Sequence, residues 1–244
     1  MIEQFETPAG ILADYRKIEN ESALEDRFPA KSVYGLLKLT AEKHPDRPAS
    51  SFQMFSEPGS KAQTLSWRDM LEKVTQAANL FRSLGAGEDD AVAYLLPGLN
   101  EAVITVTGAM TAGKANPINP LLEPEIIAAI LRESGAKVLV TIKSFPKVDL
   151  AEKAAQAAAL APNVETIVEI DMLPHLSGLK KLIVPMIRPK MTVPRKARVL
   201  DFHKALAEQP MDRLTFEETG EDRICGMFHT GGTTGTPKLA QHRM

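Results

Sequence analysis

The sequence predicts an α/β protein whose mostly parallel sheet carries helices on both faces. From about Ser32 onward, short apolar runs bounded by turn residues alternate with segments in which apolar residues recur every three or four positions. The run 91–96 is apolar throughout, as expected for a strand that is buried on both faces. Repeated strand–helix–strand units favour right-handed crossovers, and such connections place neighbouring strands parallel.

The first predicted elements are a helix and a hairpin. Ser32 is a suitable N-cap for a helix over 33–44. Two extended runs, 49–55 and 62–65, flank the turn-forming stretch 57–60, which reads Glu-Pro-Gly-Ser. Two extended runs joined by such a turn predict a β-hairpin with a loop of several residues.

An amphipathic helix follows the hairpin. Ser66 is its predicted cap, apolar residues recur at helical spacing between Trp67 and Phe81, and Gly85 is its predicted stop. The remaining predicted elements, in order, are the strand 91–96, a helix capped by Asn100 and ending near Gly113, an extended linker 117–120, a helix from Pro124 to Gly135, a strand 137–142, a helix 150–160, a strand 164–170, a helix 201–209 and a strand 223–228.

The segment 174–200 breaks this regular alternation and contains no acidic residue. Apolar residues are mixed there with the basic residues Lys180, Lys181, Arg188, Lys190, Arg195, Lys196 and Arg198. Two interpretations are open. A solvated loop or short helix that covers the sheet is favoured, and the alternative is peripheral contact of residues 180–198 with an anionic membrane surface.

Composition narrows the class of protein. The chain has 244 residues, of which 44% are hydrophobic and 25% charged, as is usual for a soluble globular protein. A formal net charge of -2 gives no electrostatic reason to expect nucleic acid as a partner. The single cysteine, Cys225, excludes an intramolecular disulfide. With no signal peptide and no apolar run of about 18 residues, a cytoplasmic protein is expected.

A glycine- and threonine-rich stretch late in the chain carries the predicted chemistry. Glycines let backbone N–H groups approach an anion closely and form concave nests around it. Threonine hydroxyls can donate to phosphate oxygens or bind a magnesium ion that bridges them, and a lysine adds positive charge beside a leaving phosphate. The candidate phosphate-binding residues are Thr230, Gly231, Gly232, Thr233, Thr234, Gly235, Thr236 and Lys238, and Lys238 is also the candidate catalytic residue.

Two better-known phosphate loops do not fit this spacing. A Walker loop has its lysine directly after a glycine, whereas Thr236 and Pro237 separate Gly235 from Lys238. The dinucleotide pattern Gly-x-Gly-x-x-Gly is absent from the stretch as well. A glycine–threonine turn without a ligand is the remaining alternative, and the predicted strand before the loop and the lysine after it disfavour that reading.

The stretch resembles the signature of the adenylate-forming superfamily, which includes acyl-CoA synthetases, luciferases and peptide-synthetase adenylation domains. That signature reads approximately Thr-Ser/Gly-Gly-Thr-Thr-Gly-x-Pro-Lys, and the residues from Thr230 to Lys238 match it throughout. Further stretches that resemble family motifs, so that the likeness covers about 32–238, are 64–85, 90–97, 112–120 and 134–137.

The resemblance implies a ligase that uses ATP, Mg²⁺ and coenzyme A. A carboxylate would attack the α-phosphate of ATP to give an acyl-adenylate and pyrophosphate, and coenzyme A would then take the acyl group. The Gly231-Gly232 pair and the sequence from Pro237 to His242 are most similar to the fatty-acid type of acyl-CoA synthetase. The alternatives are a peptide-synthetase-type adenylation domain and a non-catalytic nucleotide-binding or assembly module.

The resemblance also implies a fragment that is truncated just after the phosphate loop and inactive by itself. It corresponds to the N-terminal subdomain of the adenylate-forming fold, without the strand that follows the loop. We therefore expect an unpaired sheet edge, with poor autonomous stability or a homodimer as the result. The predicted parts are an N-terminal extension 1–31, an α/β sheet subdomain 32–173, a basic-apolar connecting segment 174–200, and a terminal part 201–244 with a helix, a strand and the loop.

The histidines receive separate interpretations. His229 either contacts phosphate or the acyl pocket, or it closes the preceding strand. His242 corresponds to a histidine that the family often carries near the start of the helix after the loop. His44, His175 and His203 are interpreted as surface or cap residues. The chain has no Cys/His cluster at ligand spacing, so no metal held by protein ligands is predicted.

Overall fold

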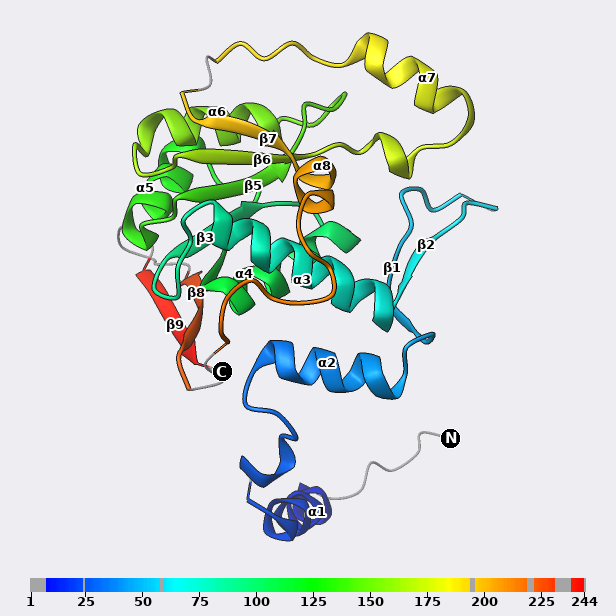
Figure 1. Ribbon diagram of the computed structural model, residues 1–244, viewed down its shortest axis with the longest axis vertical. Helices are drawn as coiled ribbons and strands as arrows, with labels where there is room; N and C mark the ends of the chain where they lie inside the picture. The colour runs from blue at the N-terminus through cyan, green and yellow to red at the C-terminus, as the bar shows by residue number, and fades with distance from the viewer. Residues whose placement is uncertain are drawn as a thin grey trace.

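The computed structural model describes residues 8–23, 25–57, 59–193, 196–218, 222–230 and 238–243. Within these residues, a seven-stranded sheet has the strand order β7-β6-β5-β3-β4-β8-β9 (Figure 1). All neighbouring strands are parallel except β8 and β9. The strands are β3 (Ala91–Leu95), β4 (Lys114–Pro117), β5 (Val138–Ile142), β6 (Thr166–Ile170), β7 (Arg198–Asp201), β8 (Ile224–Thr230) and β9 (Lys238–Arg243).

Helices cover both faces of the sheet, which confirms the predicted fold class. On one face, α3 packs against α4, α8 and α2, and on the other face α5 packs against α6 (Figure 1). The bounds of these helices are α2 (Val33–Lys43), α3 (Trp67–Ser83), α4 (Asn100–Ala112), α5 (Pro124–Ser134), α6 (Leu150–Leu160) and α8 (Phe202–Ala207). Every residue of β5 and β6 is buried, because helices lie on both sides of these strands.

Several helix ends form as the local sequence predicts. The Ser66 hydroxyl accepts from the backbone N–H of Asp69, and the Asp69 carboxylate accepts from the backbone N–H of Ser66, so that the two residues form a capping box at the start of α3. Ser32 caps α2 by accepting from the N–H of Gly35. Gly135 ends α5 at a φ of 65°, a left-handed conformation that glycine adopts without steric cost.

The predicted hairpin is also confirmed. The strands β1 (Pro48–Phe52) and β2 (Gln63–Ser66) pair antiparallel as a separate two-stranded sheet. Asn100, however, is not the N-cap of α4, because Leu99 occupies that position without a side-chain cap. The amide of Asn100 instead accepts from the hydroxyl of Ser50 at 2.8 Å and donates to the carbonyl of Gln63 at 2.9 Å. This tertiary contact ties the hairpin to the helix.

The sequence analysis misses a strand that ends at the first residue of the predicted linker 117–120. Residues 114–117 form β4, which lies between β3 and β8. Asn116 is fully buried in β4, and its side-chain amide donates to the carbonyl of Met227 in β8 at 2.7 Å. A strand this short, with a polar and a proline residue in it, gives no apolar run for the sequence to reveal.

A strand does follow the phosphate loop, so the prediction that it is missing was wrong. Residues 238–243 form β9, which pairs antiparallel with β8 and becomes the edge of the sheet. His242 accordingly lies in a strand and not near the start of a helix. The partner of β9 is the strand directly before the loop, so the pair forms as a hairpin and needs no distant segment.

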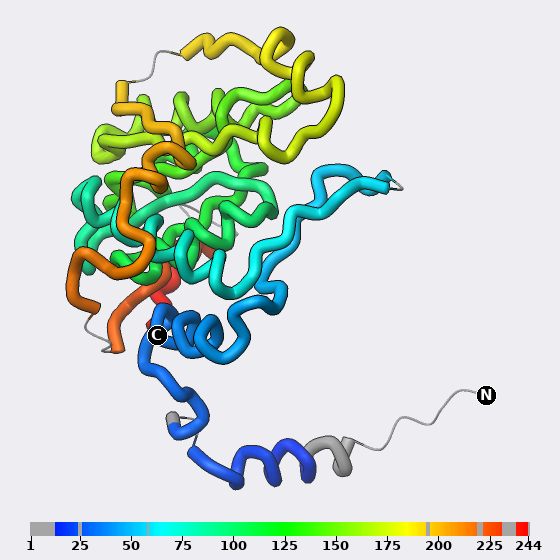
Figure 2. Tube along the Cα trace, turned by 45° about the vertical axis from the view of Figure 1, so that its right-hand side comes forward, coloured from blue at the N-terminus to red at the C-terminus, as the bar shows by residue number. Residues whose placement is uncertain are grey.

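The N-terminal extension contains a helix that the sequence analysis does not assign. Helix α1 (Pro8–Glu21) is followed by a short 3₁₀ turn, η1 (Glu25–Arg27). Figures 1 and 2 both show α1 apart from the sheet, beyond α2. The four-part division of the chain at 31, 173 and 200 stays a prediction.

The segment between β6 and β7 holds a second 3₁₀ turn, η2 (Leu173–His175), and the helix α7 (Gly178–Ile187). A short helix therefore forms, but no residue of α7 is buried. The expected short helix does not cover the sheet, since α7 lies beyond it and none of its residues is buried (Figure 1).

Candidate functional site

The described ends of the phosphate loop lie side by side. Thr230, the last residue of β8, is paired in register with Lys238, the first residue of β9. The Thr230 hydroxyl donates to the Lys238 carbonyl at 3.3 Å. Six predicted site residues fall between these ends and lie outside the described residues: Gly231, Gly232, Thr233, Thr234, Gly235 and Thr236.

The base of the loop offers an available positive charge. Both Thr230 and Lys238 are exposed. Among the described residues, the Lys238 ammonium has no ion-pair partner, so its charge is free for an anionic ligand. A free ammonium at the end of a strand suits the oxygens of a polyphosphate, whereas the Thr230 hydroxyl donates to the Lys238 carbonyl. The described residues therefore fit the predicted phosphate site.

His229 connects this base to the neighbouring strand. It precedes Thr230 in β8, and its Nε2 accepts from the backbone N–H of Asn119 at 3.4 Å. Asn119 lies just beyond the end of β4, and its side-chain carbonyl accepts from the N–H of Leu121 at 2.9 Å. Of the two interpretations of His229, the described contact fits the one in which it closes the strand.

Arg223 anchors the other end of β8 to helix α4. Its Nη1 donates to the carbonyl of Gly113 at 2.7 Å, and its Nη2 donates to the carbonyls of Met110 at 2.6 Å and Thr111 at 3.1 Å. These carbonyls have no partner within the helix, so the guanidinium caps α4. Desolvation by burial lowers the pKa of Arg223, and the charge of Glu88 opposes that shift. The strand that carries the loop is thus held to α4 at the end away from the loop.

Aromatic rings stabilise the β8–β9 pair from the side. The ring of Phe228 lies over Gly226, where an added Cβ would be 2.7 Å from the ring. The ring of His242 meets Phe228 edge-on, with centroids 4.8 Å apart. An aromatic ring over a strand glycine replaces packing that the missing side chain would have provided. His242 therefore has a structural contact in the described residues.

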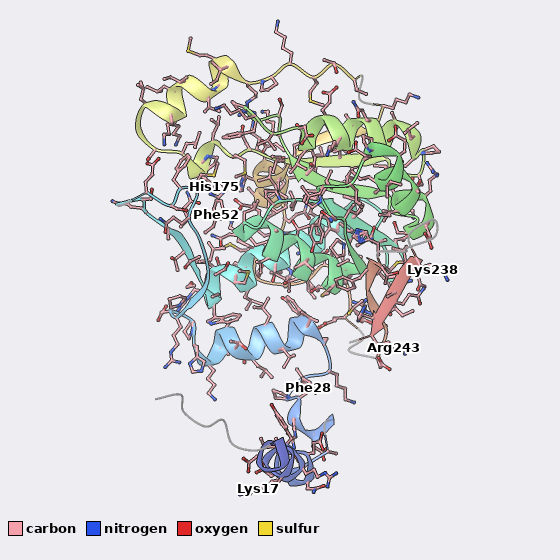
Figure 3. The ribbon with its side chains drawn as sticks, turned by 180° about the vertical axis from the view of Figure 1, so that it is seen from behind. Lys17, Phe28, Phe52, His175, Lys238 and Arg243 are labelled. Carbon is pink, nitrogen blue, oxygen red and sulfur yellow. The ribbon has the colours of Figure 1, made fainter. Side chains whose placement is uncertain are left out.

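The sequence analysis missed a second cluster of ionisable groups. Glu101, in the first turn of α4, is 7% exposed, and the side chain of His175 is 2% exposed. His175 Nε2 donates to Glu101 Oε1 at 3.1 Å, and His203 Nε2 lies 3.4 Å from the same oxygen. Figure 3 shows His175 beside Phe52, and their rings meet edge-on at 5.0 Å. The interpretation of His175 as a surface or cap residue was therefore wrong.

The other two histidines follow that interpretation more closely. His44 is the C-cap of α2, and its backbone N–H donates to the carbonyl of Thr40. The side chain of His203 is 42% exposed in the first turn of α8. The cluster joins α4, α8 and the 3₁₀ turn after β6, segments far apart in the sequence. Only the position of Glu101 at the start of an apolar helix hinted at a buried acid.

The cluster makes the stability of the fold depend on pH. Burial raises the pKa of Glu101. The hydrogen bond and charge of His175, with a smaller effect from His203, lower that pKa by more than burial raises it, so the net shift is downward. A carboxyl whose pKa is lowered on folding stabilises the protein above its unfolded pKa of 4.5. That contribution is lost as the pH falls through the lower folded value.

Replacing Glu101 with glutamine is expected to destabilise the protein by about 1–2 kcal/mol at pH 7, because His175 loses an ionised partner in a buried site. Urea unfolding of the variant and the wild type from pH 7 to pH 3 measures the difference. The difference in free energy of unfolding between the two proteins should be largest at neutral pH and should shrink below pH 4.5. The exposed substitution Glu133→Gln is the control, and a gap that does not change with pH would contradict the assignment.

No group of three His, Cys, Asp or Glu side chains in the described part of the chain is arranged to hold a metal ion. The Glu101 cluster is therefore interpreted as a contact that holds α4, α8 and the turn after β6 together. His175 lies away from Lys238, on the opposite side of the molecule in Figure 3.

Comparison with known proteins finds a matching family model and relatives that are named as CoA ligases. The family model described as AMP-binding enzyme matches residues 37–244. A marinolic acid–CoA ligase from Pseudoalteromonas sp. (strain SANK 73390) is 33% identical over 233 residues, covering 95% of this chain and 32% of that protein. A long-chain-fatty-acid–CoA ligase from Bacillus subtilis (strain 168) is 27% identical, covering 93% of this chain and 38% of that protein.

Solved structures share the fold. A crystal structure of an anthranilate CoA ligase in complex with anthranoyl-AMP matches with a TM-score of 0.64 and 22% identity, covering 90% of this chain and 36% of that one. A Mycobacterium tuberculosis fatty acyl CoA synthetase matches with a TM-score of 0.56 and 21% identity, covering 87% of this chain and 34% of that one. The chain spans about a third of the length of the curated relatives that it matches.

Proposed function

This chain belongs to the AMP-binding enzyme family, and we propose that it is the N-terminal part of an ATP-dependent acid–thiol ligase. The ligase would activate a carboxylic acid as its acyl-adenylate and transfer the acyl group to coenzyme A. The observation that carries this proposal is the pairing of Thr230 with Lys238 at the two ends of the family's phosphate loop, with the lysine charge free for an anion.

The proposed reaction has two half-reactions. In the first, an oxygen of the carboxylate attacks the α-phosphorus of ATP, and the bond to the β-phosphate oxygen breaks to release pyrophosphate. In the second, the thiolate of coenzyme A attacks the acyl carbon, and AMP leaves with the electron pair of the broken bond. Magnesium would supply charge neutralisation at the phosphates.

The loop residues would act in the first half-reaction. The backbone N–H groups and hydroxyls of the stretch Thr230 to Thr236 would bind the β- and γ-phosphates, and Lys238 would neutralise charge on the departing pyrophosphate. The fold supports this role, because Arg223 and Asn116 fix β8 to α4 and β4 and so hold the base of the loop.

We further propose a fatty acid as the substrate. The similarity to the Bacillus subtilis long-chain-fatty-acid–CoA ligase extends over 93% of this chain. Acetyl-coenzyme A synthetases also match, such as that of Methanothrix thermoacetophila with 27% identity over 79% of this chain, so the chain length of the acid needs a direct test. A peptide-synthetase-type adenylation domain and a non-catalytic nucleotide-binding module are the alternative functions.

Pyrophosphate exchange by the full-length protein tests the proposal. The exchange of labelled pyrophosphate into ATP should require a carboxylic acid, should be strongest with long-chain acids, and should be followed by a thioester when coenzyme A is added. Exchange that requires amino acids would favour the peptide-synthetase alternative. ATP binding without exchange for any acid would favour the non-catalytic module. For residues 1–244 alone, we propose that no exchange occurs.

A homodimer formed through the sheet edge stays a separate proposal, and the charges on the edge strand oppose it. The edge strand is β9, which carries Lys238 and Arg243 at its ends, and charged residues on an edge oppose pairing between chains. Size-exclusion chromatography over a range of concentrations tests for the homodimer. A monomer at every concentration would contradict the homodimer.

The cytoplasmic location of the protein stays a prediction.

A further inference from the structure

Helix α7 exposes a continuous apolar face. Leu179, Leu182, Ile183 and Met186 follow the spacing that places side chains on one face of a helix. All four are exposed, with Leu182 at 70% and Met186 at 85%. An exposed apolar face of this kind is costly in water, so it indicates a contact surface.

The helix is held in this orientation from the other side. The Lys180 ammonium lies 3.5 Å from the Glu57 carboxylate and 3.8 Å from the centroid of the Phe55 ring, both in the loop between β1 and β2. Figures 1 and 2 show the hairpin and α7 projecting toward the same side of the molecule. Lys180 is not part of the apolar face, so this contact leaves the apolar face exposed.

The chain after α7 is pinned as well. Arg188 donates to the Asp171 carboxylate at 2.8 Å, at the end of β6. Ser144 donates to the carbonyl of Pro189 at 2.7 Å, and the backbone N–H of Thr192 donates to the Glu152 carboxylate at 3.3 Å. Contacts within the helix and after it thus tie α7 to the rest of the protein.

Basic residues flank the apolar residues of this helix along the sequence. No acidic residue occurs between Asp171 and Asp201. Lys181, Lys190 and Lys196 are exposed. Each of these lysines lacks an ion-pair partner within the described part of the chain. An apolar helix face flanked by lysines complements a bilayer whose head groups are anionic, because the apolar side chains enter the acyl boundary while the lysines meet the phosphates.

We propose that α7 and its basic flanks bind the surface of an anionic lipid bilayer. The mode is peripheral, since no helix in the described ranges is long and apolar enough to cross a membrane. The surface lies beyond β7, at the opposite edge of the sheet from the phosphate loop (Figure 1). Membrane binding therefore involves residues other than the loop, and it does not depend on the proposed ligase activity.

Sedimentation of the full-length protein with lipid vesicles tests this inference. Binding is expected on phosphatidylcholine vesicles that contain phosphatidylglycerol, and it should weaken on pure phosphatidylcholine and at high salt. The double variant Leu182→Ser/Met186→Ser should bind the anionic vesicles at least about tenfold more weakly. The variant Lys181→Glu/Lys190→Glu should lose more than about tenfold on the same vesicles.

Matched controls separate this surface from general effects. Leu160→Ser/Met211→Ser removes two exposed apolar side chains elsewhere, and Lys31→Glu/Lys38→Glu reverses two exposed lysines near α2. Both controls should bind vesicles as the wild type does, and circular dichroism should show every variant folded. Equal binding to neutral vesicles would overturn the proposal. So would a protein that ignores all vesicles but dimerises through Leu182 and Met186, because the occupant would then be a second copy.

Discussion

Replacing Lys238 with alanine in the full-length protein is expected to slow adenylate formation by about 10²–10³-fold, the usual effect of removing one group that stabilises developing charge. The lysine ammonium lies at the base of the loop and has no ion-pair partner in the described residues. Its removal therefore takes away a charge that faces the ligand and breaks no described ion pair within the protein. The contacts that hold β9 use the backbone of Lys238, including the carbonyl that accepts from Thr230. The variant should therefore fold normally.

The two half-reactions must be measured separately. Pyrophosphate exchange reports adenylate formation, whereas thioester formation from a supplied acyl-adenylate reports the transfer to coenzyme A. The loss should fall mainly on the first reaction, and equal losses in both would contradict the role of the lysine. Arg243→Ala is the matched control, because it removes a positive charge from the other end of β9 (Figure 3). Arg243 pairs there with Asp222 at 3.0 Å.

Replacing Gly113 with alanine is expected to destabilise the protein by about 3 kcal/mol, near the upper end of the cost of overpacking. Gly113 lies between α4 and β4, where an added Cβ would be 2.4 Å from the carbonyl oxygen of Gly87 and 2.6 Å from that of Asp90. Both neighbours are backbone atoms, and the Asp90 carbonyl also accepts from the N–H of Lys114 at 3.0 Å. Relief of the clash therefore requires movement of strand β3 or β4.

Thermal and urea unfolding of the 244-residue chain measure this effect. Gly98→Ala is the control, because no atom lies within 4 Å of the Cβ that it adds. Its free energy of unfolding should stay within about 0.5 kcal/mol of the wild-type value. Equal stability of the Gly113→Ala and Gly98→Ala variants would show that the crowding at Gly113 is relieved without cost.

Features of the fold that depend on near neighbours could be predicted from the sequence. The capping box of Ser66 and the left-handed Gly135 involve residues within a few positions of one another, and the hairpin around 57–60 pairs strands that adjoin in the sequence. Strand β3 is predictable for the same reason, because the run 91–96 is apolar throughout. The candidate phosphate loop is predicted from one short stretch, and the structure adds the pairing of the residues on either side of it, Thr230 and Lys238.

Features that depend on distant partners could not be predicted. Asn100 looks like a cap, but Ser50 and Gln63 approach it only in the folded protein. His175 is buried because Glu101, which is 74 residues away, accepts its hydrogen bond. Strand β4 is recognisable by the neighbours β3 and β8 and not by its own composition. In each case a tertiary contact outweighs the local preference.

The bond between Asn116 and Met227 joins strands that are 111 residues apart in the sequence. A ribosome adds roughly 5–20 residues per second, so β8 leaves it roughly 6–20 s after β4. Strands β3, β4, β5 and β6 are joined by short crossovers and can pair during that interval. The side of β4 that pairs with β8 stays open during this interval, and the side-chain amide of Asn116 has not yet met its acceptor, the carbonyl of Met227. The base of the phosphate loop is therefore among the last parts of this chain to fold during synthesis.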